Sequence, residues 1–106
     1  LVPLPPACKT LLAVFDSVAA ASWTVSAIIR AGIVPAALEM MDQLIVGAVE
    51  AAYGFGFPTD AGAVLIVELD GVAEAVEEQT AQVREICRAG GAGRVDVARD
   101  EAERQL

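Results

Sequence analysis

Short apolar runs alternate with longer, partly polar stretches along the 106 residues of this chain. The first apolar run covers 10–15 and is stopped by Asp16 and Ser17, which is typical of a strand in the middle of a sheet. The stretch 17–31 follows with helical spacing and almost no charge, and either Asp16 or Ser17 can cap it. It predicts a helix that is buried on more than one side and ends at Gly32.

A second strand is predicted at 33–41, with Pro35 near its start, where a missing backbone donor costs least. The alternation of side chains along a strand places Glu39 and Met41 on one face, and Leu38 and Met40 on the other. Residues 42–53 then predict a helix with Asp42 as its N-cap. Its apolar side chains lie in two adjacent rows, Leu44, Ala48 and Ala52 beside Ile45, Val49 and Tyr53.

The second half of the chain repeats this order after a loop at 54–62, which is rich in Gly and contains Pro58. Residues 63–69 form the clearest predicted strand, and Asp70 with Gly71 begins the next helix, which Gly90 and Gly91 end. The predicted inward stripe of this helix is Val72, Val76, Thr80, Val83 and Cys87. The charged side chains expected in water are Glu74, Glu77, Glu78, Glu85 and Arg88. A short strand at 94–98 and the start of a helix at 100–106 complete the pattern.

The two halves also resemble each other residue by residue. The run 11–16 matches 65–70 at an offset of 54, whereas 28–32 matches 86–90 at an offset of 58. The four extra residues are about one helical turn, so the second helix is predicted to be one turn longer. Two βαβ units in a chain of this length predict an α+β, ferredoxin-like duplicated fold. Its antiparallel sheet has both helices on one face, and the helix at 42–53 is an addition between the halves.

Composition supports one domain, 1–106, with a modest core. The net charge of −8 argues against nucleic acid and against an anionic membrane surface as partners. No stretch is long and apolar enough to predict a membrane span. The two cysteines, Cys8 and Cys87, predict isolated thiols in a cytoplasmic protein and not a disulfide framework.

The chain contains no histidine, the commonest catalytic base and metal ligand. No Ser or Cys therefore has a histidine to activate it, and a catalytic triad is excluded within this chain. The segment 54–59 resembles a phosphate-binding glycine loop, but it follows a helix and precedes a strand, which is the wrong order for anion capture at a helix N-terminus. A plain loop is the preferred interpretation.

Four acidic residues form two pairs, each where a predicted strand ends and a helix begins: Glu39 with Asp42, and Glu68 with Asp70. Helix capping is the preferred role for both aspartates, because an acid there accepts from free N–H groups. A metal site made only of carboxylates is the alternative, but the spacing of these residues is not that of a recognisable ligand set. We therefore predict no catalytic, cofactor-binding or metal-binding residues in this chain.

Two apolar features remain as candidates for contact. The pair Met40 and Met41 is expected to pack within its strand and not against a cofactor. The uncharged face around Trp23 is either a contact surface for another domain or part of the protein's own core; the sequence leaves both open.

Four segments carry a resemblance to a known family: Leu4-Pro-Pro, 10–16, 33–42 and 57–71. Pro-Ala-Ala-Leu-Glu-Met-Met-Asp and Glu-Leu-Asp-Gly are their most specific parts. Together they resemble the C-terminal domain of FAD-linked oxidases, nearest to the glycolate oxidase FAD subunit and D-lactate dehydrogenase type. The resemblance covers essentially the whole chain.

The resemblance implies an FAD-dependent oxidoreductase in which another domain binds the flavin and this one helps to hold a 2-hydroxy acid. The family's substrate-binding arginine and its histidine-rich motif fall after segments like those present here, so no family site residue is carried over. The absence of an initial Met and a helical pattern that continues to Leu106 also lead us to expect a fragment of that domain. We expect it to be catalytically inert, to contact the FAD-binding domain and to self-associate through exposed apolar surface and sheet edges.

A different function class fits the same predicted fold. The chain could be a free-standing ferredoxin-like binding or regulatory module that dimerises through its sheet. That module would need no flavin and no further domain.

Overall fold

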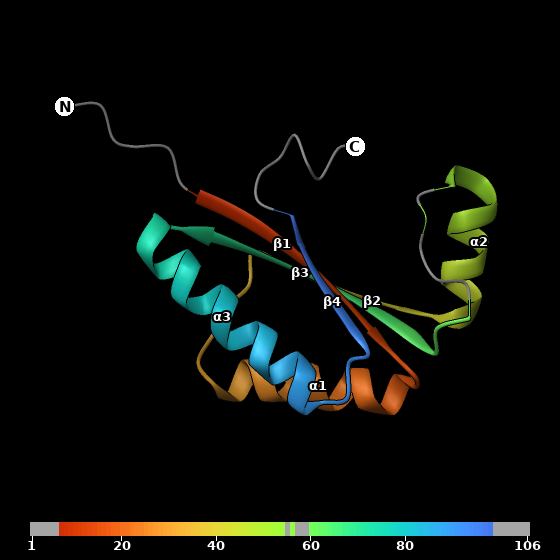
Figure 1. Ribbon diagram of the computed structural model, residues 1–106, viewed down its shortest axis with the longest axis horizontal. Helices are drawn as coiled ribbons and strands as arrows, with labels where there is room; N and C mark the ends of the chain where they lie inside the picture. Colours follow the sequence, from red (N-terminus) through yellow and green to blue (C-terminus); the bar gives the residue numbers. More distant parts are fainter. Residues whose placement is uncertain (1–6, 55, 57–59, 99–106) are drawn as a thin grey trace.

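The computed structural model describes residues 7–54, 56 and 60–98, and Figure 1 shows their arrangement. The elements of this part of the chain follow one another as β1 (Ala7–Phe15), α1 (Val18–Arg30), β2 (Ala37–Asp42), α2 (Gln43–Tyr53), β3 (Ala63–Gly71), α3 (Ala73–Ala89) and β4 (Arg94–Ala98). The predicted order of strands and helices is therefore confirmed. The helix predicted at 100–106 lies outside the described residues.

The four strands form one antiparallel sheet in the order β2-β3-β1-β4. The two nine-residue strands, β1 and β3, occupy the centre and pair along their whole length, from Ala7 opposite Gly71 to Phe15 opposite Ala63. Each βαβ unit thus contributes one central strand and one edge strand. This is the predicted ferredoxin-like α+β architecture, with α1 and α3 on a single face of the sheet (Figure 1).

The main core lies between the sheet and these two helices. Alternate residues of β1 and β3 point into it, because side chains of a strand alternate between its faces. The predicted inward stripe of α3 is buried at four of its five positions; the exception is Val72, which precedes the helix and is 73% exposed. The largest buried side chains are Phe15, Leu11, Ile28, Leu65 and Leu69.

Equivalent hydrogen bonds end α1 and α3 and give the true correspondence of the two halves. Ile33 N–H donates to Ile28 O at 3.4 Å, and Ala92 N–H donates to Cys87 O at 3.0 Å. Ile28 and Cys87 are both fully buried and lie 59 positions apart, so the predicted offset of 58 is wrong by one residue. The helix lengths, 13 and 17 residues, confirm that the second is one turn longer.

The structure shows which of the residues predicted to cap helices do so. Ser17 is the N-cap of α1, where its hydroxyl accepts from Ala20 N–H at 3.1 Å. Asp42 caps α2 as predicted, by accepting from Ile45 N–H at 2.9 Å. Asp70 caps nothing: it still belongs to β3, and Val72 is the N-cap of α3 without a side-chain bond, so that prediction was wrong.

The edge strand β2 and the helix after it also differ from expectation. β2 starts at Ala37 and not at residue 33, because Pro35 cannot donate to the sheet ladder. In α2 only Val46 is buried, whereas the predicted row of Leu44, Ala48 and Ala52 faces solvent. The apolar pattern of α2 therefore does not serve the core of the described fold.

Candidate functional site on the open face of the sheet

The sheet face opposite α1 and α3, called here the open face, is only partly covered. Residues directly opposite each other in paired strands share a face, so the register places its side chains in rows across all four strands. The row nearest α2 is Arg94, Val14, Val64 and Met41. The next rows are Asp96, Leu12, Ile66 and Glu39, and then Ala98, Thr10, Glu68 and Ala37. The centre of the open face is thus apolar and both its edges are charged.

One end of the open face is closed by α2, which stands beside the sheet in Figure 1. Val46 packs with Ala61 against Val64, and this small cluster also contacts Met41 and Val14. α2 exposes large apolar side chains on more than one side: Leu44 at 82%, Tyr53 at 71% and Ile45 at 47%. The helix therefore adds exposed apolar area beside the open face, called here the outward surface of α2.

The four carboxylates proposed as pairs do not come together in one site. Asp42 is used as a helix cap, and Glu39 lies opposite Ile66 in the middle row. Glu68 belongs to the next row, and Asp70 lies opposite Cys8 beyond it. Within the described residues no group of three or more His, Cys, Asp or Glu side chains is placed to hold a metal ion.

The charge of the open face is acidic. Arg94 is its basic residue in the described rows, and its Nη2 lies 2.6 Å from the Oδ2 of Asp96 on the same strand. The alternation of side chains along β4 puts Arg94 and Asp96 on the same face, where they pair. A ligand for this surface has to tolerate carboxylates, which disfavours phosphates.

The two cysteines are free thiols, and their environments differ. Cys87 is fully buried in the main core, and this burial raises the pKa of its thiol to about 11. It therefore stays neutral at physiological pH and is a poor nucleophile. The half-buried Cys8 lies on the open face, and its Sγ donates to Glu68 Oε1 at 3.4 Å.

A polar depression of about 580 Å³ lies on the other side of the sheet, between α3 and β4. An ion pair between Lys9 and Glu77 forms part of its wall, and Thr80 and Arg84 line it further. The Thr80 hydroxyl donates to Val76 O at 2.6 Å and so is already used. Among the described residues that line the depression, no Ser or Cys side chain lies beside a base.

The remaining candidates from the sequence have structural roles or lie outside the residues that the structure describes. Met41 packs beneath α2, as expected, whereas Met40 is 40% exposed and its Sδ lies 3.9 Å from Ser22 Oγ. Gly54 ends α2 with φ of +66°, while most of the glycine-containing loop after it is outside the described residues. Trp23 is 48% exposed, so its burial in the protein's own core is excluded.

Comparison with known proteins identifies what this arrangement is similar to. The family model for the C-terminal domain of FAD linked oxidases matches residues 4–106. Glycolate oxidase subunit GlcD of Escherichia coli K12 is 48% identical over 104 residues, which cover 98% of this chain and 21% of that protein. Glycolate oxidase subunit GlcD of Bacillus subtilis is 45% identical over 103 residues, covering 97% of this chain and 22% of that protein.

The fold has a solved counterpart. Alkyldihydroxyacetonephosphate synthase superimposes with a TM-score of 0.64 over 86% of this chain and 20% of its own, at 16% identity. At that identity the likeness concerns the fold alone. The chain thus spans about one fifth of the length of the curated relatives it matches.

No helix among the described residues is long and apolar enough to span a membrane.

Proposed function

We propose, because the chain belongs to the family of FAD linked oxidase C-terminal domains, that it is part of the substrate (cap) domain of a flavin-dependent oxidoreductase acting on a 2-hydroxy acid of the glycolate or D-lactate type. The observation that carries this proposal is the 48% identity to a glycolate oxidase subunit across 98% of the chain. The family supports FAD as the cofactor of the parent protein. When bound in the parent protein, FAD would supply the acceptor for a hydride from the substrate carbon.

The residues described here do not fit FAD themselves. A flavin dinucleotide carries a diphosphate, which needs free donors or cations around it. The open face instead carries Glu39, Glu68 and Asp96, and Arg94 is already paired with Asp96. We therefore assign no step of the reaction to these side chains and expect the isolated chain to be inert.

The role that we assign to the chain is structural: it provides a rigid contact surface. The open face and the outward surface of α2 contact the part of the longer protein that binds the flavin. Leu44, Ile45 and Tyr53 make α2 too apolar for a surface that stays in water, and only Glu50 is charged within the helix. The central pair of strands holds this surface in place, because β1 and β3 pair with each other over all nine of their residues.

A chimera tests the function. The matching segment of the Escherichia coli glycolate oxidase subunit would be replaced by these 106 residues, and flavin content and glycolate oxidation would be measured. We expect the chimera to retain FAD and to oxidise a 2-hydroxy acid, while the isolated chain binds no FAD. A chimera that folds and retains FAD but oxidises neither glycolate nor D-lactate would refute the proposed substrate class.

Substitutions in the chimera test the contact surface. Leu44→Glu should lower FAD retention and activity, because it places a charge in the apolar contact. Val72→Glu is the matched control: Val72 is also highly exposed, at 73%, but it lies at the start of α3, away from α2 and the open face. Equal effects of the two variants would contradict a docking role for α2.

The alternative function, a free-standing module that dimerises through its sheet, shares the ferredoxin-like fold. The identity to glycolate oxidase subunits favours the enzyme domain instead. A chimera with no flavin and no activity, together with a stable dimer of the isolated chain through the open face, would favour the module.

A further inference from the structure

The outward face of α1 is a second unpartnered surface, separate from the open face and from α2. Ala21, Thr24 and Ile28 are buried against the sheet and α3. On the opposite side of the helix a stripe runs from Ala19 through Trp23 and Ser26 to Arg30, with spacings of four, three and four residues. All four residues are exposed, and Val18 and Ile29 flank the stripe at 43% and 56% exposure.

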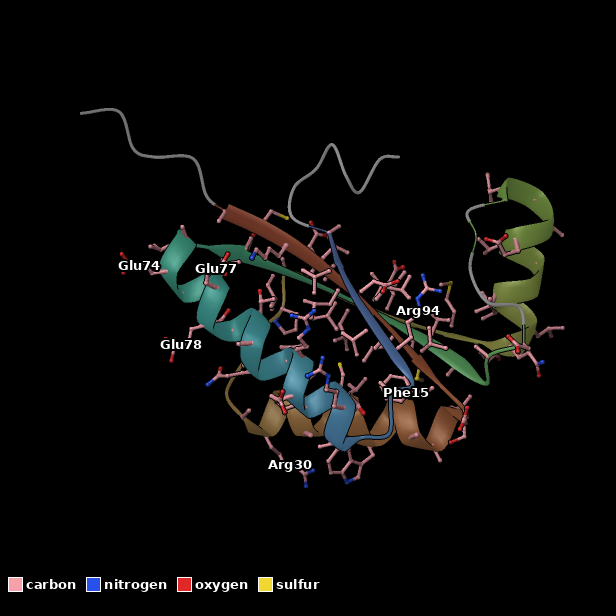
Figure 2. The ribbon with its side chains drawn as sticks, in the orientation of Figure 1. Phe15, Arg30, Glu74, Glu77, Glu78 and Arg94 are labelled. Atoms are coloured by element: carbon pink, nitrogen blue, oxygen red, sulfur yellow. The ribbon has the colours of Figure 1, made fainter. Side chains whose placement is uncertain are left out.

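Charge distinguishes α1 from the other described helices. It contains no acidic residue, whereas α2 carries Glu50 and α3 carries four glutamates. Its charges lie at its ends: Asp16 is exposed just before the N-cap, and Arg30 closes the last turn. Figure 2 shows Arg30 pointing away from the body of the protein. Within the described residues no salt bridge or hydrogen bond engages either side chain.

The spacing of these charges is symmetric about the tryptophan. Trp23 lies seven residues after Asp16 and seven before Arg30. Two copies of α1 that pack antiparallel about a twofold axis at Trp23 would therefore bring each Asp16 next to the Arg30 of the other copy. A twofold interface requires this reciprocity, in which residue i contacts j and j contacts i. The two helix dipoles would also oppose each other, which is favourable.

We propose that the outward face of α1 binds a second copy of this chain, with Trp23 stacked on its symmetry mate and two reciprocal Asp16–Arg30 ion pairs at the ends. The ends are about 20 Å apart, since the helix rises about 1.5 Å per residue. Small side chains at Ala19 and Ser26 allow the helices to approach closely. This proposal is independent of the oxidoreductase function.

The net charge of −8 explains why the second copy would use this face. Two equally acidic chains repel each other, so they can approach most closely where carboxylates are few and a cation is present. The contact is small: one 13-residue helix offers much less than the roughly 800 Å² per partner of a standard interface. We therefore expect a weak, reversible dimer and not an obligate one.

Sedimentation of the 106-residue chain tests the proposal, from about 1 µM to about 1 mM, the range that suits a small interface. We expect a monomer at the low end, a dimer at the high end, and a blue shift of Trp23 fluorescence over the same range. Trp23 is the chain's single tryptophan, so the emission reports this face directly. Arg30→Asp and Asp16→Arg should each weaken association by at least about tenfold, because each creates two like-charge contacts.

Charge reversal provides the decisive control. The double variant Asp16→Arg/Arg30→Asp restores opposite charges and should dimerise within about threefold of the wild type. Arg88→Asp changes the net charge by the same amount as Arg30→Asp, but on the last turn of α3, and should leave the dimer intact. Circular dichroism confirms that each variant is folded.

Three results would overturn the proposal: a monomer at every concentration, a dimer that Arg30→Asp leaves unchanged, or a double variant that stays monomeric while folded. A dimer lost only in Leu44→Glu would place the self-association on α2 instead.

Discussion

Gly90→Ala is expected to destabilise the protein, although glycine is not needed there for the backbone. Gly90 is the C-cap of α3 with φ −78° and ψ −1°, and its counterpart at the end of α1 is Ala31 with φ −73° and ψ −3°. An alanine therefore adopts this conformation without strain. The reason for glycine is packing: a Cβ at Gly90 would lie 1.9 Å from Thr24 Oγ1 and 3.2 Å from a ring carbon of Trp23.

The size of the destabilisation by Gly90→Ala follows from the movement that it requires of the Thr24 side chain. Thr24 is fully buried, and its hydroxyl donates to Ala20 O at 2.9 Å. Turning the hydroxyl away from a new methyl group breaks this bond, which contributes about 0.5–1.5 kcal/mol, and overpacking as a whole costs about 1–3 kcal/mol. The lower chain entropy of alanine in the unfolded state offsets about 0.4–1 kcal/mol. The net loss is about 1–2 kcal/mol, or roughly 5–15 °C in Tm for a domain of this size.

Urea unfolding followed by Trp23 fluorescence measures this loss. Gly47→Ala is the control: a Cβ there meets no atom within 4 Å, and the helix interior should gain about 1 kcal/mol. Adding Thr24→Ala to Gly90→Ala should recover part of the loss, because it removes the clashing hydroxyl, and the two changes should couple by about 0.5 kcal/mol or more. A Gly90→Ala protein as stable as the wild type would refute the packing argument.

Four further outcomes are expected. Asp42→Ala should remove the cap of α2 and cost about 1 kcal/mol, with faster amide exchange in α2, whereas Asp70→Ala should change little, because Asp70 caps no helix. A thiol reagent at neutral pH should modify Cys8 and spare Cys87 in the folded protein; equal rates would contradict the burial of Cys87. Because burial raises the pKa of Cys87 from 9.0 to about 11, its neutral thiol stabilises the fold fully below pH 9 and this contribution is lost as the pH rises to about 11, so the free energy of unfolding should fall more steeply over that range in the wild type than in Cys87→Val. Phe15→Ala should cost about 3–5 kcal/mol in urea unfolding, since Phe15 is a fully buried core side chain.

Much of the fold could be predicted from local patterns. The strand Arg94–Ala98 was predicted with its observed bounds, and α1 and α3 within two residues at most ends. Alternation and helical spacing depend on neighbours along the chain, so the sequence states them directly. The ferredoxin-like topology followed from the duplication, because two βαβ units have few ways to share one sheet.

The parts that failed depend on contacts between distant residues. The offset of the two halves was wrong by one because Arg-Ala-Gly recurs by chance next to the true equivalence of Ile28 and Cys87. Asp70 was predicted as a cap because the sequence does not mark the residue at which this strand ends. Pairing with Cys8 keeps Asp70 in the sheet. The rows of the open face define the candidate site. They could not be predicted from the sequence, because they depend on the register between strands.

The apolar rows of α2 illustrate the same limit in another way. Their spacing predicted a helix, and the helix is present, but spacing alone cannot say which surface a helix will contact. The structure shows that Val46 is the residue of α2 that packs against the sheet, and that Leu44 and Tyr53 are exposed to solvent.

The pairing of β1 with β4 has a consequence for how such a unit can be transferred between proteins. Thr10, near the beginning of the first strand, lies directly opposite Ala98, at the end of the last one. The backbone thus enters and leaves this unit at neighbouring points. A host chain can therefore exchange the described unit for a homologous one while its own two attachment points stay close together.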